Sequence, residues 1–376
     1  MSNSETIPTP AAGGPPAFKG GGLPTLIGSL PATDHAAALA MILASTPQLP
    51  LWPQLPHYPR ERMLHQFIEG LPGVIEQQTA QGGDRIFFDC SAPDFEEEQL
   101  KFYEEYLRVE EDEAALLTSR FQISKERAAG LYHLAKLAAG QPGLTGIKGQ
   151  ITGPFTMLTG IVDQHDRLGY YDPVIRDIVV KGLAMKAAWQ VRFFKEKFAD
   201  LPVLLFIDEP GLAGLGTSSL ISIDGEEVGR DLDEVAGAVQ QAGGLAGVHV
   251  CANTDWRLLL SSRIDIISFD AYDFFDRFIL AKDEIYNFLN RGGTIAWGLV
   301  PTVEAEKITA ATTAALVSLW EEQAGRLVTP QWDLAGLLGQ SLITPSCGTG
   351  SLTPALAARV LALTREVATV LREKYL

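Results

Sequence analysis

Short apolar runs alternate with longer amphipathic segments along the chain from about residue 23 onward. Short apolar runs are typical of buried strands, and the amphipathic segments between most of them have the period of helices. Strands are predicted at 24–30, 49–55, 85–90, 145–151, 203–209, 245–251, 265–271, 294–300 and 341–347. Helices are predicted at 35–45, 60–77, 94–117, 123–139, 173–199, 228–242, 303–325 and 354–374. This alternation implies right-handed crossovers and a parallel sheet, and it favours an α/β (β/α)8 TIM barrel.

The predicted strands number one more than an eight-stranded barrel needs. The run at 85–90 is the weakest of them, so we assign it to a helical excursion between the second and third strands. The acidic helix at 94–117 belongs to the same excursion, and its glutamates are interpreted as a solvated face. Residues 1–22, rich in Pro, Gly, Ala, Ser and Thr, are predicted to be a disordered leader, and residues 23–376 a single barrel domain.

Composition narrows the possible partners. The formal charge of −16 argues against nucleic acid or an anionic membrane surface, because phosphate binding needs clustered Lys and Arg. Three scattered cysteines fit a reducing compartment better than a disulfide framework. No apolar run reaches the roughly 20 residues that span a bilayer, and the N-terminus lacks the pattern of a signal peptide. A cytoplasmic enzyme is therefore expected.

The pair His249 and Cys251 is the main candidate for chemistry. Both lie at the end of the strand predicted at 245–251, and side chains two residues apart on a strand point to the same face. Cys347 follows the last strand, and in a barrel the carboxyl ends of all strands meet at one mouth. His-x-Cys alone fits a buried, inert pair equally well. With Cys347 added, the N, S and S donors predict a catalytic zinc site with an open fourth position.

Asp270 lies near the end of the strand predicted at 265–271 and has three interpretations. It is either a further weak metal ligand, or a partner that orients His249, or else the N-cap of the next helix. The residue type and position do not distinguish these alternatives.

Two further strand ends carry polar groups. Asp208 and Glu209 follow the apolar run at 203–207, and adjacent residues on a strand point to opposite sides, so one carboxylate is expected to face the mouth and the other to serve the fold. A carboxylate in an apolar mouth suits a substrate ammonium group. At the end of the first strand, Gly28 permits close backbone approach and Ser29 can hold a carboxylate, although the pair also fits a plain turn. The small residues and hydroxyls of 148–156 have the same two interpretations.

In order along the chain, several motifs resemble the C-terminal catalytic barrel of cobalamin-independent methionine synthase, within the fold group shared with uroporphyrinogen decarboxylase. They are Ile-Gly-Ser-Leu-Pro-Ala-Thr (27–33), Ile-Thr-Gly-Pro-Phe-Thr (151–156), Ile-Asp-Glu-Pro (207–210), His-Val-Cys (249–251), Ile-Ser-Phe-Asp (267–270) and Ser-Cys-Gly (346–348). The resemblance implies zinc held by His249, Cys251, Asp270 and Cys347, with Asp270 standing where the family has Glu. It also implies that Ser29, with Gly28 beside it, and the catalytic carboxylate Asp208 bind the amino acid end of homocysteine.

The family resemblance also implies S-methyl transfer to homocysteine, which gives methionine. The chain is too short to contain the family's second, N-terminal barrel, which helps to hold methylfolate, so a methylated corrinoid, free or on a corrinoid protein, is the expected donor. Methylcobamide:coenzyme M methyltransferases resemble the chain as well, which keeps another thiol acceptor as an alternative. A barrel that binds a thiol or corrinoid without turnover is a third hypothesis. A uroporphyrinogen-type decarboxylase would leave the three candidate ligands unexplained.

Overall fold

A computed structural model describes residues 18–78, 84–137 and 141–376. Its centre is a curled sheet of seven parallel strands in the order β1-β10-β9-β8-β7-β6-β4. Most strands are buried along their full length, which is typical of a parallel sheet covered by helices. The strands are β1 (Leu23–Pro24), β4 (Ile147–Thr152), β6 (Val203–Asp208), β7 (Leu245–Val250), β8 (Ile266–Phe269), β9 (Thr294–Val300) and β10 (Ser341–Pro345).

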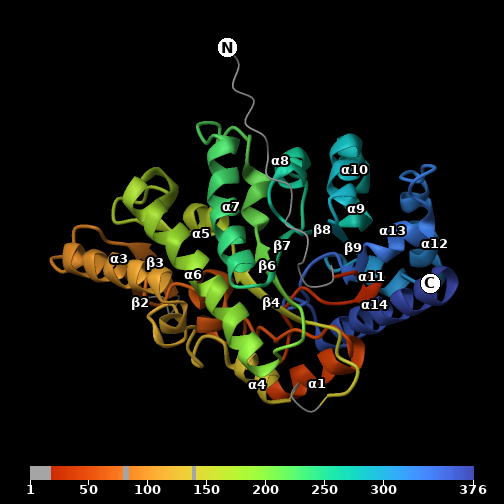
Figure 1. Cartoon of the computed structure of the whole chain (residues 1–376), viewed down its shortest axis with the longest axis horizontal. Coiled ribbons are helices and arrows are strands. Elements are labelled where there is room, and N and C mark those ends of the chain that lie inside the picture. Colours follow the sequence, from red (N-terminus) through yellow and green to blue (C-terminus); the bar gives the residue numbers. More distant parts are fainter. Residues whose placement is uncertain (1–17, 79–83, 138–140) are drawn as a thin grey trace.

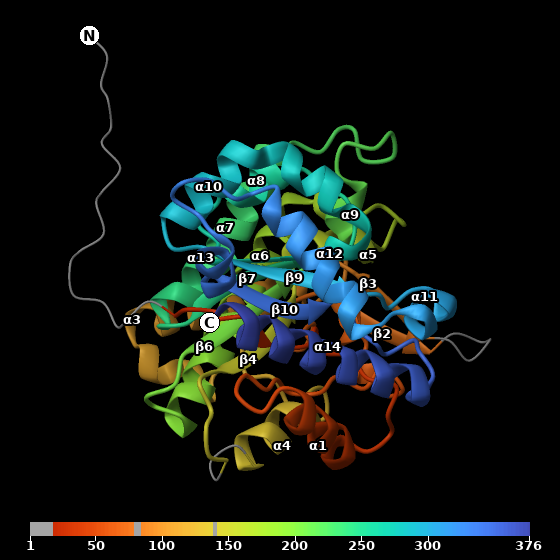
Figure 2. The ribbon, with the colours of Figure 1, turned by 90° about the vertical axis from the view of Figure 1, so that its right-hand side faces the viewer.

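Helices surround these strands (Figure 1), and Figure 2 shows the strands in the middle of the ring that the helices form. The predicted alternation and the parallel sheet are confirmed. Among the described residues, no helix has the length and apolar character needed to cross a membrane. The helices are α1 (His35–Ser45), α2 (Met63–Gln66), α3 (Phe95–Glu111), α4 (Ala129–Leu137), α5 (Pro154–Gly160), α6 (Pro173–Lys197), α7 (Gly225–Gln241), α8 (Trp256–Ser261), α9 (Ala271–Phe278), α10 (Lys282–Asn290), α11 (Ala305–Ala310), α12 (Thr313–Gly325), α13 (Leu334–Gly339) and α14 (Pro354–Tyr375).

The first two predicted strands are mostly irregular. Of 24–30, only the start belongs to β1, and 49–55 contains isolated bridges instead of a regular strand. The segment still joins both neighbours: the Gln54 amide donates to the Gly28 carbonyl, and the Lys148 amide donates to the Pro50 carbonyl. Pro50 and Pro53 have no N–H to donate to a ladder, which explains why the pairing is interrupted.

The excursion before β4 exists, and the prediction that 85–90 lies outside the main sheet is confirmed. A small second sheet has the order β2-β3-β5, with β2 at Val74–Gln78, β3 at Asp84–Phe88 and β5 at Val162–Asp163. The helix predicted at 60–77 is wrong. The helical structure there is limited to a 3-10 turn at Pro59–Glu61 and the short α2, and β2 begins at Val74. Gly70 and Gly73 adopt φ of 78° and 72°, which ends the helical geometry.

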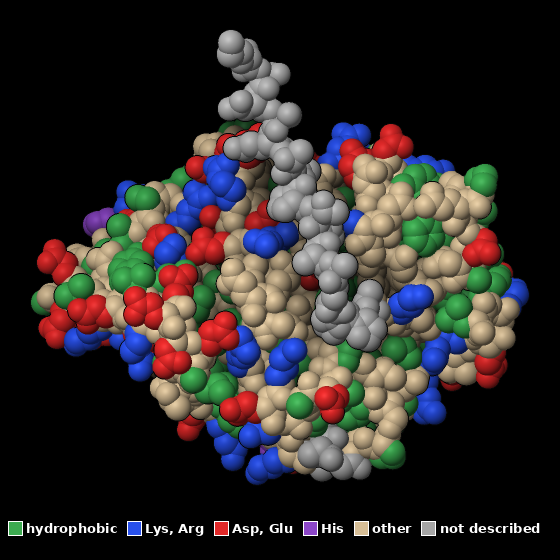
Figure 3. Space-filling view, in the orientation of Figure 1, with side chains coloured by type: hydrophobic (Ala, Val, Ile, Leu, Met, Phe, Trp, Pro, Cys, Tyr) green, Lys and Arg blue, Asp and Glu red, His purple; other side chains and the backbone are tan. Residues whose placement is uncertain are grey.

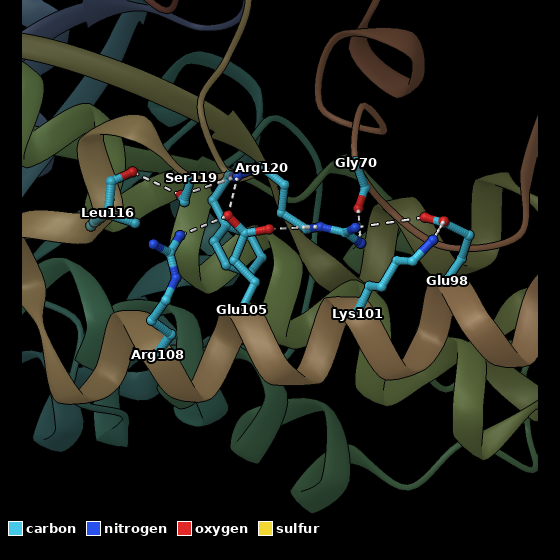
Figure 4. Close-up of polar contacts among 9 residues, drawn as sticks. Gly70, Glu98, Lys101, Glu105, Arg108, Leu116, Ser119 and Arg120 are labelled. Atoms are coloured by element: carbon cyan, nitrogen blue, oxygen red, sulfur yellow. Dashed lines mark hydrogen bonds and ion pairs between the residues drawn. The ribbon is translucent and has the colours of Figure 1, made fainter.

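Helix α3 carries the acidic face expected from the sequence. It lies at the left of Figure 1, and Figure 3, in the same orientation, shows acidic side chains gathered at that end. One glutamate does more than face solvent. The Glu105 carboxylate accepts hydrogen bonds from the backbone N–H and the Nε of Arg120, and it pairs with Arg108 (Figure 4). Glu105 therefore ties the chain that follows the 3-10 helix Glu113–Thr118 back onto α3.

Of the expected leader, residues 1–17 lie outside the described residues. The remaining part is attached to the sheet edge: the amides of Gly21 and Gly22 donate to the carbonyls of Gly339 and Ser341. Both glycines have positive φ, of 55° and 63°, so this turn needs a residue without a Cβ.

Lys186 is a buried amine on α6. The residue is 1% exposed, and its Nζ has no hydrogen-bond partner among the residues that the structure describes; burial lowers the pKa of this lysine to about 7. Below pH 7 the amine is charged in both the folded and unfolded states, so the full desolvation cost is present. Between about pH 7 and 10.5 only the unfolded chain binds the proton, so the free energy of unfolding rises with pH. Lys186→Met is expected to raise this free energy by about 2–4 kcal/mol near pH 6, and by less as the pH approaches 10.

The measurement is urea unfolding of both proteins at pH 6, 8 and 10. Lys181→Met is the matched control, because Lys181 lies on the same helix but pairs with Asp177 and Glu234. It should not stabilise the fold. A gain for Lys186→Met that is equal at all three pH values would contradict the assignment of a desolvated amine.

Candidate metal centre

Three soft donors converge at the carboxyl ends of β7 and β10. His249 lies in β7 and Cys251 one residue beyond it, while Cys347 lies two residues beyond β10. Although these residues come from segments almost 100 positions apart, one ligand atom from each lies within 4.8 Å of the other two. The predicted convergence of His249, Cys251 and Cys347 is confirmed, and the group has the donors to bind a metal ion.

The His249 ring is held in one orientation by the neighbouring strand. His249 pairs with Ser268 in the register of β7 and β8, and its Nδ1 lies 2.9 Å from the Ser268 Oγ. Both residues are buried, and within the described part of the chain the His249 Nε2 has no hydrogen-bond partner. A metal-bound histidine commonly has its second ring nitrogen bonded to a polar group in this way, so the geometry leaves Nε2 for a metal.

The thiols of Cys251 and Cys347 have pKa values shifted in opposite directions. A hydrogen bond from Cys347 and the adjacent His249 lower the pKa of Cys251, whereas the same hydrogen bond and burial raise the pKa of Cys347. Cys251 is therefore the first thiolate to form. Because a metal binds thiolates, uptake of a cation would release the second proton from Cys347.

A cavity of about 510 Å³ lies next to His249, Cys251 and Cys347. A volume of this size suits a small organic substrate. The three donors form part of its wall, together with Ser29 and Asp208 at other strand ends and with Glu61 and Arg62 from the segment just before α2.

Asp208 and Glu209 divide their roles as the sequence predicts. Glu209 serves the fold, since its carboxylate accepts hydrogen bonds from the amides of Phe155 and Thr156 at the start of α5. A Cβ at Gly153 would lie 2.2 Å from the Glu209 carboxyl group, so this cap requires glycine there. Asp208 faces the cavity instead, and its Oδ1 has no hydrogen-bond partner among the described residues.

Burial raises the pKa of Asp208, while the nearby His249 and Lys148 act in the opposite direction. Lys148 lies in β4, is 1% exposed, and donates from its Nζ to the Ile27 carbonyl at 2.7 Å. Desolvation lowers the pKa of this lysine, and the negative charge of Asp208 opposes that change. The buried carboxylate therefore has a cation in its surroundings but keeps one oxygen for a ligand.

Ser29 also lines the cavity, but part of its polar capacity is used by the fold. Its Oγ accepts from the Gly350 amide at 3.2 Å, and its carbonyl accepts from Thr349. Gly28 lies against other side chains, since a Cβ there would be 2.4 Å from Gln54 and 3.1 Å from Gln150. The close approach expected at Gly28 is thus to these glutamines.

Asp270 is the N-cap of α9, where its Oδ1 accepts from the Asp273 amide at 3.0 Å. It is not part of the three-residue group found among the described residues. Burial raises the pKa of Asp270 to about 6, and the charge of His249 partly opposes this. The residue that bonds to His249 Nδ1 is Ser268, which lies in β8 two positions before Asp270.

Four residues of the site were not predicted from the sequence. Glu61 and Arg62 line the cavity, Ser268 bonds to His249, and Lys148 is the buried cation near Asp208. Ser268 and Lys148 were within predicted strands, and a polar side chain in an otherwise apolar buried strand is the signal that would have marked them. Glu61 and Arg62 fell inside the helix wrongly predicted at 60–77, so no strand end pointed to them.

Ser268→Ala is expected to weaken metal binding by about 10- to 100-fold, because the imidazole would lose the bond that fixes its ring and tautomer. Affinity would be measured by competition with a chromophoric zinc chelator. Ser262→Ala is the matched control, since the Ser262 hydroxyl is also buried but bonds to Leu259 at the end of α8. Equal affinities for all three proteins would show that Ser268 does not position the ligand.

No protein-family model and no curated protein sequence matches the chain.

Proposed function

We propose that the protein is a zinc-dependent methyltransferase that methylates the thiol of homocysteine to form methionine. The observation that carries the proposal is the meeting of His249, Cys251 and Cys347 within 4.8 Å at the wall of a substrate-sized cavity. An inert buried pair would explain neither the third donor nor the His249 Nε2, which has no hydrogen-bond partner in the described part of the chain. The family resemblance of the ordered motifs supports the same activity.

Zinc is the metal that this donor set favours. One nitrogen and two sulfurs suit a borderline-soft cation, and three protein ligands leave a position open for a substrate. Zinc bound there would lower the pKa of an incoming thiol and hold it as a thiolate at neutral pH.

The residues of the chain supply orientation and charge. The Asp208 carboxylate lines the cavity with an oxygen that has no partner among the described residues, which suits the substrate ammonium group, and Ser29 lines the same cavity. Holding the amino acid end fixes the sulfur relative to the methyl donor. In the transfer, the sulfur–carbon bond forms while the bond from the methyl carbon to the donor breaks, and its electron pair stays on the donor. The thiol proton leaves to solvent.

The complete fold is inferred to be a (β/α)8 barrel in which residues 48–54 serve as the eighth strand. The support is hydrogen bonding on both sides: the Leu30 amide donates to the Gln54 carbonyl, and the Thr145 amide donates to the Gln48 carbonyl. A closed barrel would gather the carboxyl ends of all strands around the cavity, which is where barrel enzymes place their active sites.

A methylated corrinoid, free or bound to a protein, is the proposed donor, and this step rests on the family resemblance alone. The test is a product assay with zinc-loaded protein. Methylcobalamin, a methylated corrinoid protein and methyltetrahydrofolate are each supplied with homocysteine, and methylcobalamin is also supplied with coenzyme M. Methionine from a corrinoid donor is the expected product. Methylation of coenzyme M alone, or of no thiol by any donor, would contradict the proposed function.

A further inference from the structure

We propose that Arg62 is the residue that selects the substrate class, by binding the carboxylate of a zwitterionic amino acid thiol whose ammonium group is bound by Asp208. This inference rests on the proposed function, because it concerns the thiol that enters the same cavity. It assigns a role to a residue that lies outside the metal group and outside every motif noted in the sequence.

The first support is the position of Arg62. It lies in the turn between the 3-10 helix Pro59–Glu61 and α2, and it lines the metal cavity. Among the described residues that form the cavity wall, it is the one lysine or arginine. In a chain with a formal charge of −16, a cation at this wall is the local feature that would attract an anionic group of a ligand.

The second support is the rigidity of the turn. The buried Glu61 on one side accepts from the Leu55 amide at 2.9 Å and pairs with His35 at 2.7 Å. On the other side, the Thr152 hydroxyl donates to the Met63 carbonyl at 2.8 Å, which joins the turn to the end of β4. The Arg62 carbonyl itself accepts from two amides of α2. The backbone that carries the guanidinium is therefore fixed relative to the strand ends.

The third support is the charge pattern of the wall. Asp208 is 5% exposed, and its Oδ1 has no hydrogen-bond partner among the described residues, so a cationic group of a ligand fits there. Arg62 is exposed and lines the same cavity from a different segment, and its Nε lies 3.5 Å from the carbonyl of Pro56, another residue of the cavity wall. A guanidinium binds a carboxylate through paired N–H groups. Separate sites for a cation and an anion, next to a thiol-binding centre, match the three groups of an amino acid thiol.

The test measures thiol binding instead of turnover. Zinc-loaded full-length protein is titrated by calorimetry with four probes: homocysteine, 4-mercaptobutanoate without the amino group, 3-aminopropane-1-thiol without the carboxylate, and coenzyme M. Arg62→Gln is expected to weaken homocysteine and 4-mercaptobutanoate by about 10- to 100-fold, and to leave 3-aminopropane-1-thiol within about twofold. Arg62→Lys should restore part of the loss. Asp208→Asn should give the opposite pattern, weakening the two thiols that carry an ammonium group.

Arg60→Gln is the matched control. Arg60 is two residues away in the same turn but lines a neighbouring cavity on the other side of Glu61, so the variant should bind all four thiols as the wild type does. An equal loss for every thiol in Arg62→Gln, or no loss for homocysteine, would overturn the role of Arg62. The zwitterion assignment would be overturned if coenzyme M bound more tightly than homocysteine and Asp208→Asn did not change that binding. If the predicted binding pattern holds but no donor methylates any thiol, the proposed function fails while the assignment of Arg62 stands.

Discussion

Replacing Cys347 by serine is expected to lower the affinity for zinc by about 100- to 1,000-fold and to abolish methyl transfer. Zinc sites of this kind bind with about 10–16 kcal/mol in total, so one of three protein ligands contributes several kcal/mol. A serine hydroxyl stays protonated at neutral pH and cannot replace the thiolate. The measurements are zinc content after purification without chelator, and methionine formation from a corrinoid donor.

The third cysteine of the chain provides the control. Cys90 is half-buried beside the second sheet, outside the metal group, and burial raises the pKa of its thiol to about 11. Cys90→Ser should keep about one zinc per chain and full activity, whereas Cys251→Ser should behave as Cys347→Ser does. Retained zinc in the Cys347 variant would remove this residue from the ligand set.

Asp208→Asn is expected to lower kcat/KM for homocysteine by about 10- to 100-fold while leaving the zinc content unchanged. The substitution keeps the shape of the side chain but removes the charge that binds the substrate ammonium, and a hydrogen bond to a charged group contributes about 1.5–3 kcal/mol. Steady-state kinetics with homocysteine as the varied substrate measure the effect.

The neighbouring carboxylate gives the contrast for that experiment. Glu209 caps α5 and does not line the cavity, so Glu209→Gln should lower the free energy of unfolding by about 1–3 kcal/mol, with kcat/KM of the folded protein nearly unchanged. If Asp208→Asn keeps the wild-type kcat/KM and Glu209→Gln loses it, the roles of the two carboxylates are reversed.

The regular part of the sheet could be predicted because it is buried on both faces. The strands predicted at 203–209, 245–251, 294–300 and 341–347 match β6, β7, β9 and β10 within about two residues at each end. Prediction failed where proline or glycine controls the backbone. The segment 49–55 lacks N–H donors at its prolines, so a regular ladder does not form. Near Gly70 and Gly73 the backbone turns, although the helical periodicity of the sequence continues through this segment.

The site was predictable to the extent that it depends on strand ends. His249, Cys251 and Cys347 meet because parallel strands finish at the same edge, which sequence order already implies. The hydrogen bond from Ser268 to His249 depends instead on the register between β7 and β8, which spacing along one strand does not specify. Arg62 was missed because its position depends on a turn held by tertiary contacts with Leu55, His35 and Thr152.

X-ray absorption at the zinc edge tests the central claim most directly, because it counts the sulfur atoms around the metal. Before substrate, the expected shell is two sulfurs at about 2.3 Å with nitrogen or oxygen in the remaining positions. Saturating homocysteine should raise the count to three sulfurs, since the substrate thiolate enters the position that His249, Cys251 and Cys347 leave open. A shell that stays at two sulfurs with homocysteine bound would contradict the account.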